Sequence, residues 1–370
     1  MAILNEVTQR TSQNVVREDL ADVISRIDSR SCPLSSMIPK GKEPTNTLFE
    51  WIMDTNARPN AIAHLDGKDV DLAFTGTNGQ YDETAFANMN PDRYRAGGRV
   101  QISQEVFGVS TLAENVSDVA GVGKKGEYRE ALKKALTSIK RGIEVTISSE
   151  QNSQQESGSS PYKTRGIFNW LVTQGQAATP AGDLPLPQNS EFRCRALDNT
   201  TAIGSFTEGD LQDQLEALYN HTGNIGNLTL LCGTQLRRTI TDFSTYQSGA
   251  ATDAIALRTY NQDGNSKKIV QSVDIFVGDF GTVNVVPSVW LLQDPTLDPH
   301  ASSPTAGNTT AAGKRAGLLL DPSLLKLRFN QLPTIKELED RGAGRRGFVR
   351  TVYGLQVTNP SGLGCLKLAA

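Results

Sequence analysis

The run GVGKKG at residues 121–126 is the most suggestive chemical motif of this chain, because it fits the pattern G-x-G-x-x-G. In dinucleotide-binding enzymes that loop follows a buried strand, opens a helix and is completed by an acidic residue after the next strand. Here the preceding residues, LAENVSDVA, are too polar for a central strand, and a Gln- and Ser-rich loop follows the helix. We therefore interpret the motif as a flexible joint before a helix. A dinucleotide-dependent oxidoreductase is kept as an alternative function.

A second match to the same pattern, GAGRRG at residues 342–347, precedes a strand pattern instead of a helix. Two matches in opposite contexts indicate coincidence in a chain with 33 glycines. A phosphate-binding loop is excluded at the first match, because Glu127 and Tyr128 stand where Lys and Ser or Thr are required. We expect no cofactor at either place.

Metal and nucleophile chemistry also lack the necessary spacings. The three histidines are isolated in the sequence, and the four cysteines form no C-x-x-C pair. The segment LDGKDVD at 65–71 gathers three aspartates without the spacing of a calcium loop. No G-x-S-x-G turn is present, and the DFG triplet at 279–281 lacks the other kinase motifs, so it predicts a hairpin turn. We expect a protein that is not an enzyme and that holds no metal.

The composition excludes several function classes. The chain has 37 basic and 40 acidic residues and a net charge of −3, so it does not resemble a basic nucleic-acid-binding protein. No window approaches the roughly eighteen apolar residues of a membrane span, and the N-terminal residues do not have the pattern of a signal peptide. We expect no membrane contact, and cysteines that are reduced and mostly buried.

The first third of the chain has the pattern of extended polypeptide. The pattern of residues 1–46 predicts an arm, in which apolar side chains have helical spacing only at 18–28. Strand patterns at 47–54 and 98–109 flank about forty polar residues rich in Gly, Asp and Asn. A loop of that length is unusual inside a compact domain. We expect this excursion to be functional or to lie against a partner.

Residues 127–150 form the longest predicted helix. Apolar side chains recur at i, i+4, i+8, i+11 and i+15, which indicates one buried stripe. At 1.5 Å per residue the helix would be about 36 Å long. Glu130 and Lys134 can pair on its outer face. The stripe consists of Tyr128, Leu132, Leu136, Ile139 and Ile143.

A second helix is predicted after Phe206. Thr207 can act as the N-cap with Asp210 three residues on, and Gly223 can end the helix. Together with short strands, the two helices indicate an α+β fold with mainly antiparallel pairing. The remaining patterns are a buried strand at 227–233, a helix at 234–243, two strands within 273–287, two short strands within 316–329 and further strands within 347–368.

The arm and the excursion cannot bury their own backbone, so we expect neighbouring copies to cover them. Moderate patches suffice for such an assembly, because many contacts per copy supply strength through avidity. The sequence therefore favours self-assembly over catalysis.

Several segments, taken in order, resemble one protein family. They are similar to the tailed-phage major capsid proteins of the Hong Kong 97 type, and most closely to the SU-ten-like branch. The resemblance extends over most of the chain, although the segments near 172–204 and 246–270 are less familiar. The matching segments are DLADVISRIDSRSCPLSSMI, TLFEWIMD, GEYREALKKALTSIKRGIEVTI, TRGIFNWL, FTEGDLQDQLEALYNHTGNIGNLTLLCG, VDIFVGDFGTVNVVPSVWLL, GLLLDPSLLKLRF and GFVRTVYGLQVTNPSGLG.

The resemblance implies the parts of a Hong Kong 97-type capsid fold. In such a fold the E-loop lies across an adjacent subunit and the arm reaches a neighbour. The implied parts are an N-terminal arm at 1–46, an extended E-loop hairpin with its flanking strands at 47–110, the first part of a P-domain at 111–206 with a spine helix at 127–150, an A-domain at 207–325 and the second part of the P-domain at 326–370.

The function implied by the resemblance is that of a major capsid protein. Its copies would form homo-pentamers and homo-hexamers of an icosahedral head that encloses double-stranded DNA through weak, non-specific contact. A portal protein and scaffolding or decoration proteins would be partners, and the chain would be made in the host cytoplasm and reside in the virion. A tail-tube or head-decoration protein is the alternative among phage structural proteins, and it should lack the long spine helix.

Some relatives link their subunits covalently through an E-loop lysine and a neighbour's asparagine. Lys68 is the only lysine between Lys42 and Lys124, so it is the one candidate here. Most members of the fold lack such a bond, and we expect an ordinary exposed lysine. The residues that we expect at assembly contacts are Lys68, Asp66, Asp69, Arg93, Leu132, Leu136, Ile139 and Ile143.

Overall fold

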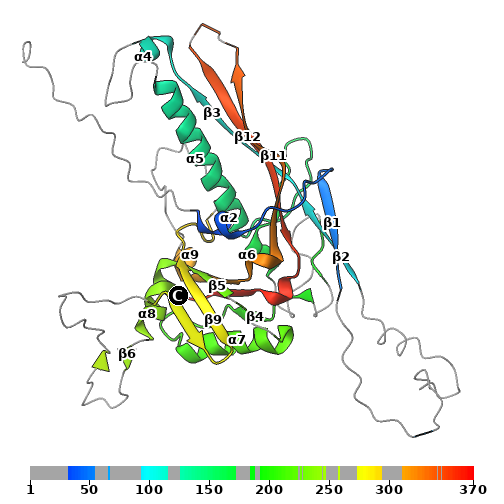
Figure 1. Cartoon of the computed structure of the whole chain (residues 1–370), viewed down its shortest axis with the longest axis vertical. Helices are drawn as coiled ribbons and strands as arrows, with labels where there is room; N and C mark the ends of the chain where they lie inside the picture. The colour runs from blue at the N-terminus through cyan, green and yellow to red at the C-terminus, as the bar shows by residue number, and fades with distance from the viewer. Residues whose placement is uncertain are drawn as a thin grey trace, which may run out of the picture. The chain divides into compact units, whose positions relative to one another are not determined.

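The computed structural model has the predicted α+β class, and its described residues fall into two compact units (Figure 1). The first unit contains Gln104–Ile139 and Pro333–Arg350. The second contains the described parts of Ser31–Ser103, Lys140–Leu332 and Thr351–Ala370. The structure describes residues 32–54, 66, 93–115, 126–171, 184–187, 192–223, 226, 228–243, 245–246, 257–258, 273–293, 311–339, 341–342 and 344–370.

The first unit combines the start of a long helix with parts of a three-stranded sheet in the order β11-β12-β3. Phe107 of the sheet packs against Tyr128 of the helix, with 5.3 Å between the ring centroids. The strand β11 has 14 residues, more than the short strand that the sequence predicts. The elements are α4 (Thr111–Asn115), α5 (Glu127–Ile147), β3 (Gln101–Gly108), β11 (Leu325–Leu338) and β12 (Arg346–Val357).

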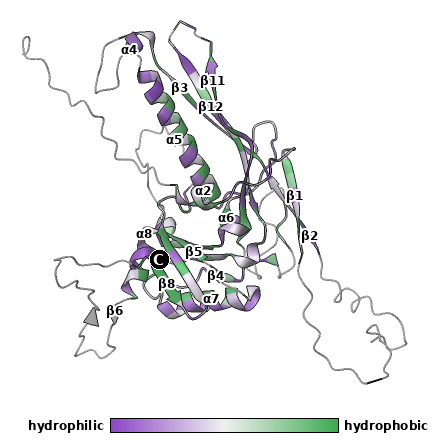
Figure 2. Ribbon diagram, viewed as in Figure 1, coloured by the Kyte–Doolittle hydropathy of each residue, from purple (hydrophilic) through white to green (hydrophobic). Residues whose placement is uncertain are grey.

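Burial along α5 differs from the predicted stripe at one position. Ala135, seven residues after Tyr128, lies about 20° from it around the helix axis, because each residue turns by about 100°. Leu136 lies about 80° away, and it is 36% exposed. The prediction that Leu136 belongs to the buried stripe is therefore wrong. Hydrophilic and hydrophobic residues alternate around α5 (Figure 2), and its buried line is Tyr128, Ala135, Ile139, Ile143 and Ile147, with Leu132 half-buried.

The helix α5 ends at Ile147, short of the predicted end at residue 150. Just beyond it, the Ser148 hydroxyl donates to the Glu144 carbonyl at 2.7 Å, and the Ser149 hydroxyl donates to the Thr146 carbonyl at 2.8 Å. Serine side chains that bond back in this way offer the backbone an alternative to further helical hydrogen bonds.

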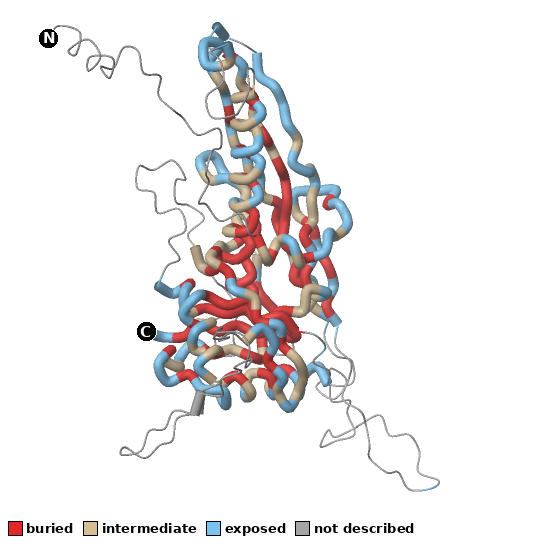
Figure 3. The backbone as a smooth tube through the Cα atoms, turned by 60° about the vertical axis from the view of Figure 1, so that its left-hand side comes forward, coloured by how far each residue is buried: buried red, intermediate tan, exposed pale blue. Residues whose placement is uncertain are grey.

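The second unit contains a six-stranded sheet in the order β4-β13-β10-β5-β9-β8. Two neighbouring pairs, β5 with β9 and β13 with β4, are parallel, and the other three are antiparallel. The inner strands β5 and β10 are buried throughout, whereas β8 and β9 at one edge are only partly buried; buried stretches of the tube are red in Figure 3. The strands are β4 (Ala196–Asp198), β5 (Leu228–Cys232), β8 (Ile275–Gly278), β9 (Gly281–Pro287), β10 (Ala316–Leu320) and β13 (Gly364–Lys367).

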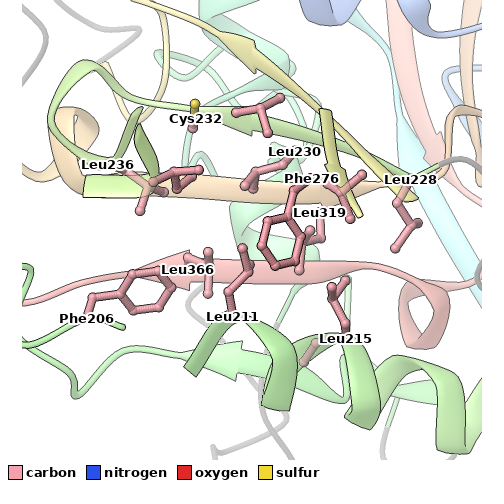
Figure 4. Packing of buried hydrophobic residues seen from close by; sticks show 14 of the residues in the cluster. Phe206, Leu211, Leu215, Leu228, Leu230, Cys232, Leu236, Phe276, Leu319 and Leu366 are labelled. Carbon is pink, nitrogen blue, oxygen red and sulfur yellow. The ribbon is translucent and has the colours of Figure 1, made fainter. Parts of the chain in front are cut away.

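Two helices, α7 (Glu208–Thr222) and α8 (Thr234–Asp242), pack on one face of this sheet. Leu211 and Leu215 of α7 point towards the strands, and Leu236 of α8 joins the same cluster (Figure 4). Each fully buried leucine contributes about 1.5–3 kcal/mol of transfer free energy. The strand residues of this cluster include Leu228, Leu230, Cys232, Phe276, Val283, Val285, Leu319 and Leu366.

The predicted caps of α7 are confirmed. The Thr207 side chain accepts a hydrogen bond from the Asp210 backbone, and the Asp210 carboxylate accepts one from the Thr207 backbone at 2.7 Å. These reciprocal bonds satisfy donors that the first turn leaves unpaired. Gly223 ends the helix with a φ of 68°, a left-handed conformation that glycine adopts without steric cost.

The sheet combines strands from distant parts of the sequence. The DFG triplet forms the turn between β8 and β9, as predicted. The last strand, β13, pairs with β10 and with β4. Strands from three predicted segments, 111–206, 207–325 and 326–370, thus share one sheet, and the limits of the A-domain and P-domain stay a prediction.

A two-stranded ribbon of the second unit consists of β1 (Leu48–Met53) and β2 (Tyr94–Arg99), paired antiparallel. It forms the root of the predicted excursion. No helix within the described residues is both long and apolar enough to cross a membrane. The remaining elements are α2 (Pro33–Met37), α6 (Ile167–Trp170), α9 (Ala311–Arg315), β6 (Thr245–Tyr246), β7 (Leu257–Arg258) and the 3-10 turns η2 (Pro322–Leu324) and η3 (Pro360–Gly362).

Candidate assembly surfaces

The structure gives the surroundings of the metal-binding and thiol side chains in the part of the chain that it describes. No group of three or more potential metal ligands occurs there. All four cysteines are free and buried, as predicted. Burial raises the pKa of Cys194 and of Cys232 to about 12, so these thiols stay protonated and unreactive near neutral pH.

Ion pairs join the two strands at the root of the excursion. Asp54 accepts a hydrogen bond from Arg93 Nε at 2.9 Å, and Glu50 pairs with Arg95. The Arg93 side chain is 74% exposed, and exposed pairs contribute little free energy, about 0–1 kcal/mol. Their effect is to hold together the points where the excursion leaves and returns.

The two faces of this ribbon differ in burial. Phe49, Trp51 and Met53 are buried on one face, whereas Ile52 is 68% exposed on the other. An open groove of about 550 Å³ runs beside β1, and Arg328 lies in it over the Phe49 ring at 5.2 Å. The lining mixes both signs of charge with apolar side chains, which suits a polypeptide better than a small reactant. The lining residues include Lys42, Glu43, Leu48, Glu50, Ile52 and Arg95.

Glu144 of α5 anchors a helix, α2, within the predicted N-terminal arm. Its buried carboxylate accepts hydrogen bonds from the backbone of Leu34 at 2.8 Å and of Ser35 at 2.7 Å, at the start of α2. Burial raises the pKa of Glu144, and the hydrogen bonds from Ser35 and Leu34 oppose that rise. The sequence analysis missed this residue, because its partners lie 110 and 109 positions away.

A strap at residues 184–187 is fastened by three side chains that the sequence analysis also missed. The Tyr94 hydroxyl donates to the Pro185 carbonyl at 3.1 Å, and Arg193 Nε donates to the Pro187 carbonyl at 2.7 Å. Arg165 is buried and donates to the Leu184 carbonyl. Proline lacks a backbone donor, so the strap is held through its carbonyls. It thereby supports β2 where the excursion returns.

A cluster of charges closes the loop between β11 and β12 in the first unit. Arg345 lies 3.1 Å from Glu337 and 3.5 Å from Glu114, with its guanidinium 4.3 Å from the centroid of the Tyr128 ring. Burial, followed by the charge of Glu337, raises the pKa of Tyr128. The charges of Arg345, Glu337 and Glu114 are therefore paired with one another within the chain.

The described residues of the second glycine motif, GAGRRG, lie in this loop and at the start of β12. Gly344 has a φ of 119°, and a Cβ there would lie 2.2 Å from the Val109 carbonyl oxygen. Gly344 therefore serves a tight backbone turn. In the first motif, residues 121–125 lie outside the described residues.

The predicted assembly residues occupy different environments. Ile139 and Ile143 are buried, Leu132 is half-buried and Leu136 is exposed. Asp66 is exposed in a turn. Lys68 and Asp69 lie outside the described residues, so the candidate cross-link stays a prediction, as does every contact between copies.

The fold and the sequence lead to one family. The sequence model of the family described as SU10 major capsid protein matches residues 5–370. The chain belongs to the SU10 major capsid protein family. It is a major capsid protein of a tailed phage, as the sequence predicts, and so belongs to a family of structural proteins.

Solved structures support the Hong Kong 97-type fold of this SU10-family protein. The capsid of a native GTA particle matches with a TM-score of 0.56 at 13% identity, covering 98% of this chain and 99% of that chain. The mature capsid of bacteriophage PhiM1 matches with a TM-score of 0.54 at 10% identity, covering 98% and 96%. The capsid of cyanophage P-SCSP1u matches with a TM-score of 0.52 at 12% identity, covering 96% and 93%. No curated protein matches the sequence.

Proposed function

We propose that this chain is the repeating subunit of an icosahedral phage head, in which it forms homo-pentamers and homo-hexamers. The family match over residues 5–370 carries the proposal. Large apolar side chains on separate elements support it: Ile52 is 68% exposed, Leu112 75% and Val277 72%. Side chains spread in this way suit a subunit that touches several neighbours through moderate patches.

The proposed head encloses double-stranded DNA without binding it tightly. A net charge of −3 leaves no excess of cations to neutralise phosphates, so a packaged genome can slide past the wall. A portal protein and scaffolding or decoration proteins complete the proposed assembly, which takes place in the host cytoplasm.

Deletion of Asn56–Arg93 tests the proposed role of the excursion. The cut leaves β1 and β2 intact, so the subunit should still fold but should no longer form shells. Circular dichroism checks the fold, and negative-stain electron microscopy counts the particles. A variant with the excursion replaced by an equally long Gly/Ser linker separates loss of contacts from loss of chain length. Normal shells from both variants contradict the proposed role.

The candidate cross-link has a separate test. Particles are boiled in denaturant and separated by electrophoresis, and we expect a single monomer band. A ladder of linked chains that disappears in Lys68→Arg would instead establish a covalent bond through Lys68.

A further inference from the structure

The exposed carboxylates are the main charged groups on the outer face of α7. Glu208, Asp213 and Glu216 point away from the buried leucines of this helix, which contains no Lys or Arg. Gln212 and Asn220 of the same helix donate to Glu208 and Glu216, each at a long 3.4 Å. Within the described residues, none of the three carboxylates forms an ion pair. We call these three residues the acidic face.

The helix dipole explains only one of the three carboxylates of the acidic face. An acid in the first turn, such as Glu208, is stabilised by the positive end of the helix dipole. Asp213 and Glu216 lie beyond that turn, and their i,i+3 spacing makes them repel each other. A cation from outside the helix would relieve that repulsion.

An exposed aromatic side chain extends the acidic face. Tyr219 is 41% exposed and lies one helical turn after Glu216. Its ring packs against Phe280 at 5.6 Å, which fixes its orientation. A carboxylate beside an aromatic ring is a favourable environment for a lysine or arginine head group.

A complementary surface lies on α8 and α9 of the same unit. Arg238 of α8 and Lys314 of α9 are exposed, and Arg315, which follows Lys314 in the chain, is half-buried. Helix α9 lies against the start of α8, since a Cβ on Gly233 would be 2.1 Å from the Gly313 carbonyl oxygen. Asp242 is the one carboxylate on α8, so cations prevail. We call Arg238, Lys314 and Arg315 the basic patch.

We propose that the acidic face of one copy binds the basic patch of the next copy in each capsomer. The inference rests on the proposed function, because that function supplies the rings. A contact between two acidic faces would be repulsive, so each acidic face must meet a surface of opposite charge. A head-to-tail contact between two different surfaces closes into a ring when its rotation fits.

Charge reversal on one chain tests the pairing. Asp213→Lys with Glu216→Lys should reduce assembled particles by about tenfold or more, because like charges then face each other. Arg238→Glu with Lys314→Glu should do the same. A chain with all four changes restores opposite charges across the contact and should assemble to within about twofold of wild type. Sedimentation measures the assembled fraction, and circular dichroism with thermal unfolding confirms that each variant folds.

Co-expression of the two double variants adds a test of ring geometry. One variant then has two basic surfaces and the other two acidic surfaces, so favourable contacts require strict alternation around a ring. Alternation closes in a six-membered ring but not in a five-membered one. We expect six-membered rings, flat sheets or tubes in micrographs, with few closed shells.

The outcomes separate this inference from the proposed function. If wild type forms shells and folded double variants also form them at wild-type yield, the pairing is wrong while the shell function stands. The pairing is also wrong if the chain with all four substitutions folds but assembles no better than the two double variants. If wild type forms no shells, both proposals fail.

Discussion

Arg345 in the first unit and α7 in the second show two ways of placing charge. Arg345 forms ion pairs with Glu114 and Glu337 and lies over the Tyr128 ring, so its charge is paired within the chain. The carboxylates Asp213 and Glu216 on α7 form no ion pair in the described part of the chain. Substitution of a charge that is paired within the chain should change the free energy of unfolding. Substitution of a charge that has no such pair should change the yield of assembled particles. Substitutions in both regions test that expectation.

Leu136→Pro should have the largest effect on stability. Proline removes a hydrogen bond inside α5 and clashes with the preceding turn, which costs about 3 kcal/mol or more. Denaturant unfolding of the subunit measures the change. Leu136→Ala is the matched control and should cost much less, since Leu136 is 36% exposed. Equal losses in both variants would show that the side chain, and not the helix, matters at this position.

Glu144→Ala should have the next largest effect on the free energy of unfolding. The change leaves the backbone donors of Leu34 and Ser35 without their acceptor, and each buried unpaired group costs about 1–3 kcal/mol. Chemical denaturation measures the loss, and limited proteolysis near residue 34 shows whether α2 detaches. Wild-type stability in this variant would mean that α2 is held by apolar packing alone.

Glu144 also predicts a dependence on pH. Its pKa in the folded chain lies above the ordinary value of 4.5, so between the two values the folded state binds more protons than the unfolded state. Stability therefore falls as pH rises through that window. Subtracting the pH profile of Glu144→Gln from that of wild type should isolate this slope. A difference of opposite sign would contradict the raised pKa.

Gly344→Ala and Gly142→Ala form a matched pair with opposite expected signs. At Gly344 the left-handed backbone and the close Val109 carbonyl should cost about 1–3 kcal/mol. At Gly142, inside α5, a Cβ meets no atom within 4 Å, so alanine should stabilise by about 0.5–1 kcal/mol. Thermal unfolding of both variants tests the pair, and the same sign for both would contradict the structure.

Arg93→Ala should have the smallest effect on stability, within about 0.5 kcal/mol, because the Arg93–Asp54 pair is exposed. Arg93 is paired within the chain but is an exception to the expectation for paired charges, since the pair is exposed and lies at the root of the excursion: its effect on shell formation should be larger than its effect on unfolding. Particle yield and unfolding are measured on the same preparation. A large loss of stability with normal yield would contradict this exception.

Local patterns in the sequence predicted most elements of this fold. The capping box at Thr207, the strand at Leu228–Cys232 and the turn at 279–281 all follow from residues close together in the sequence. The prediction for Leu136 was wrong because two successive steps of four residues turn it about 80° away from Tyr128 around the helix axis. The parallel pairing of β13 with β4 joins residues about 170 positions apart, which no local pattern encodes.

The candidate surfaces were harder to predict than the fold. Glu144 and Arg165 are charged residues in buried places, and their partners are backbone groups from distant segments. The acidic face of α7 is visible in the sequence, but only the structure shows that its carboxylates form no ion pair within the described residues. Sequence reasoning therefore reached the family and the assembly class before it could reach individual contacts.

The central claim is that this chain builds a closed shell from its own copies. Cryo-electron microscopy of the purified wild-type chain tests it most directly, over a range of protein concentrations. We predict closed icosahedral particles with five-fold and six-fold capsomers. A monodisperse monomer at every concentration would contradict the claim.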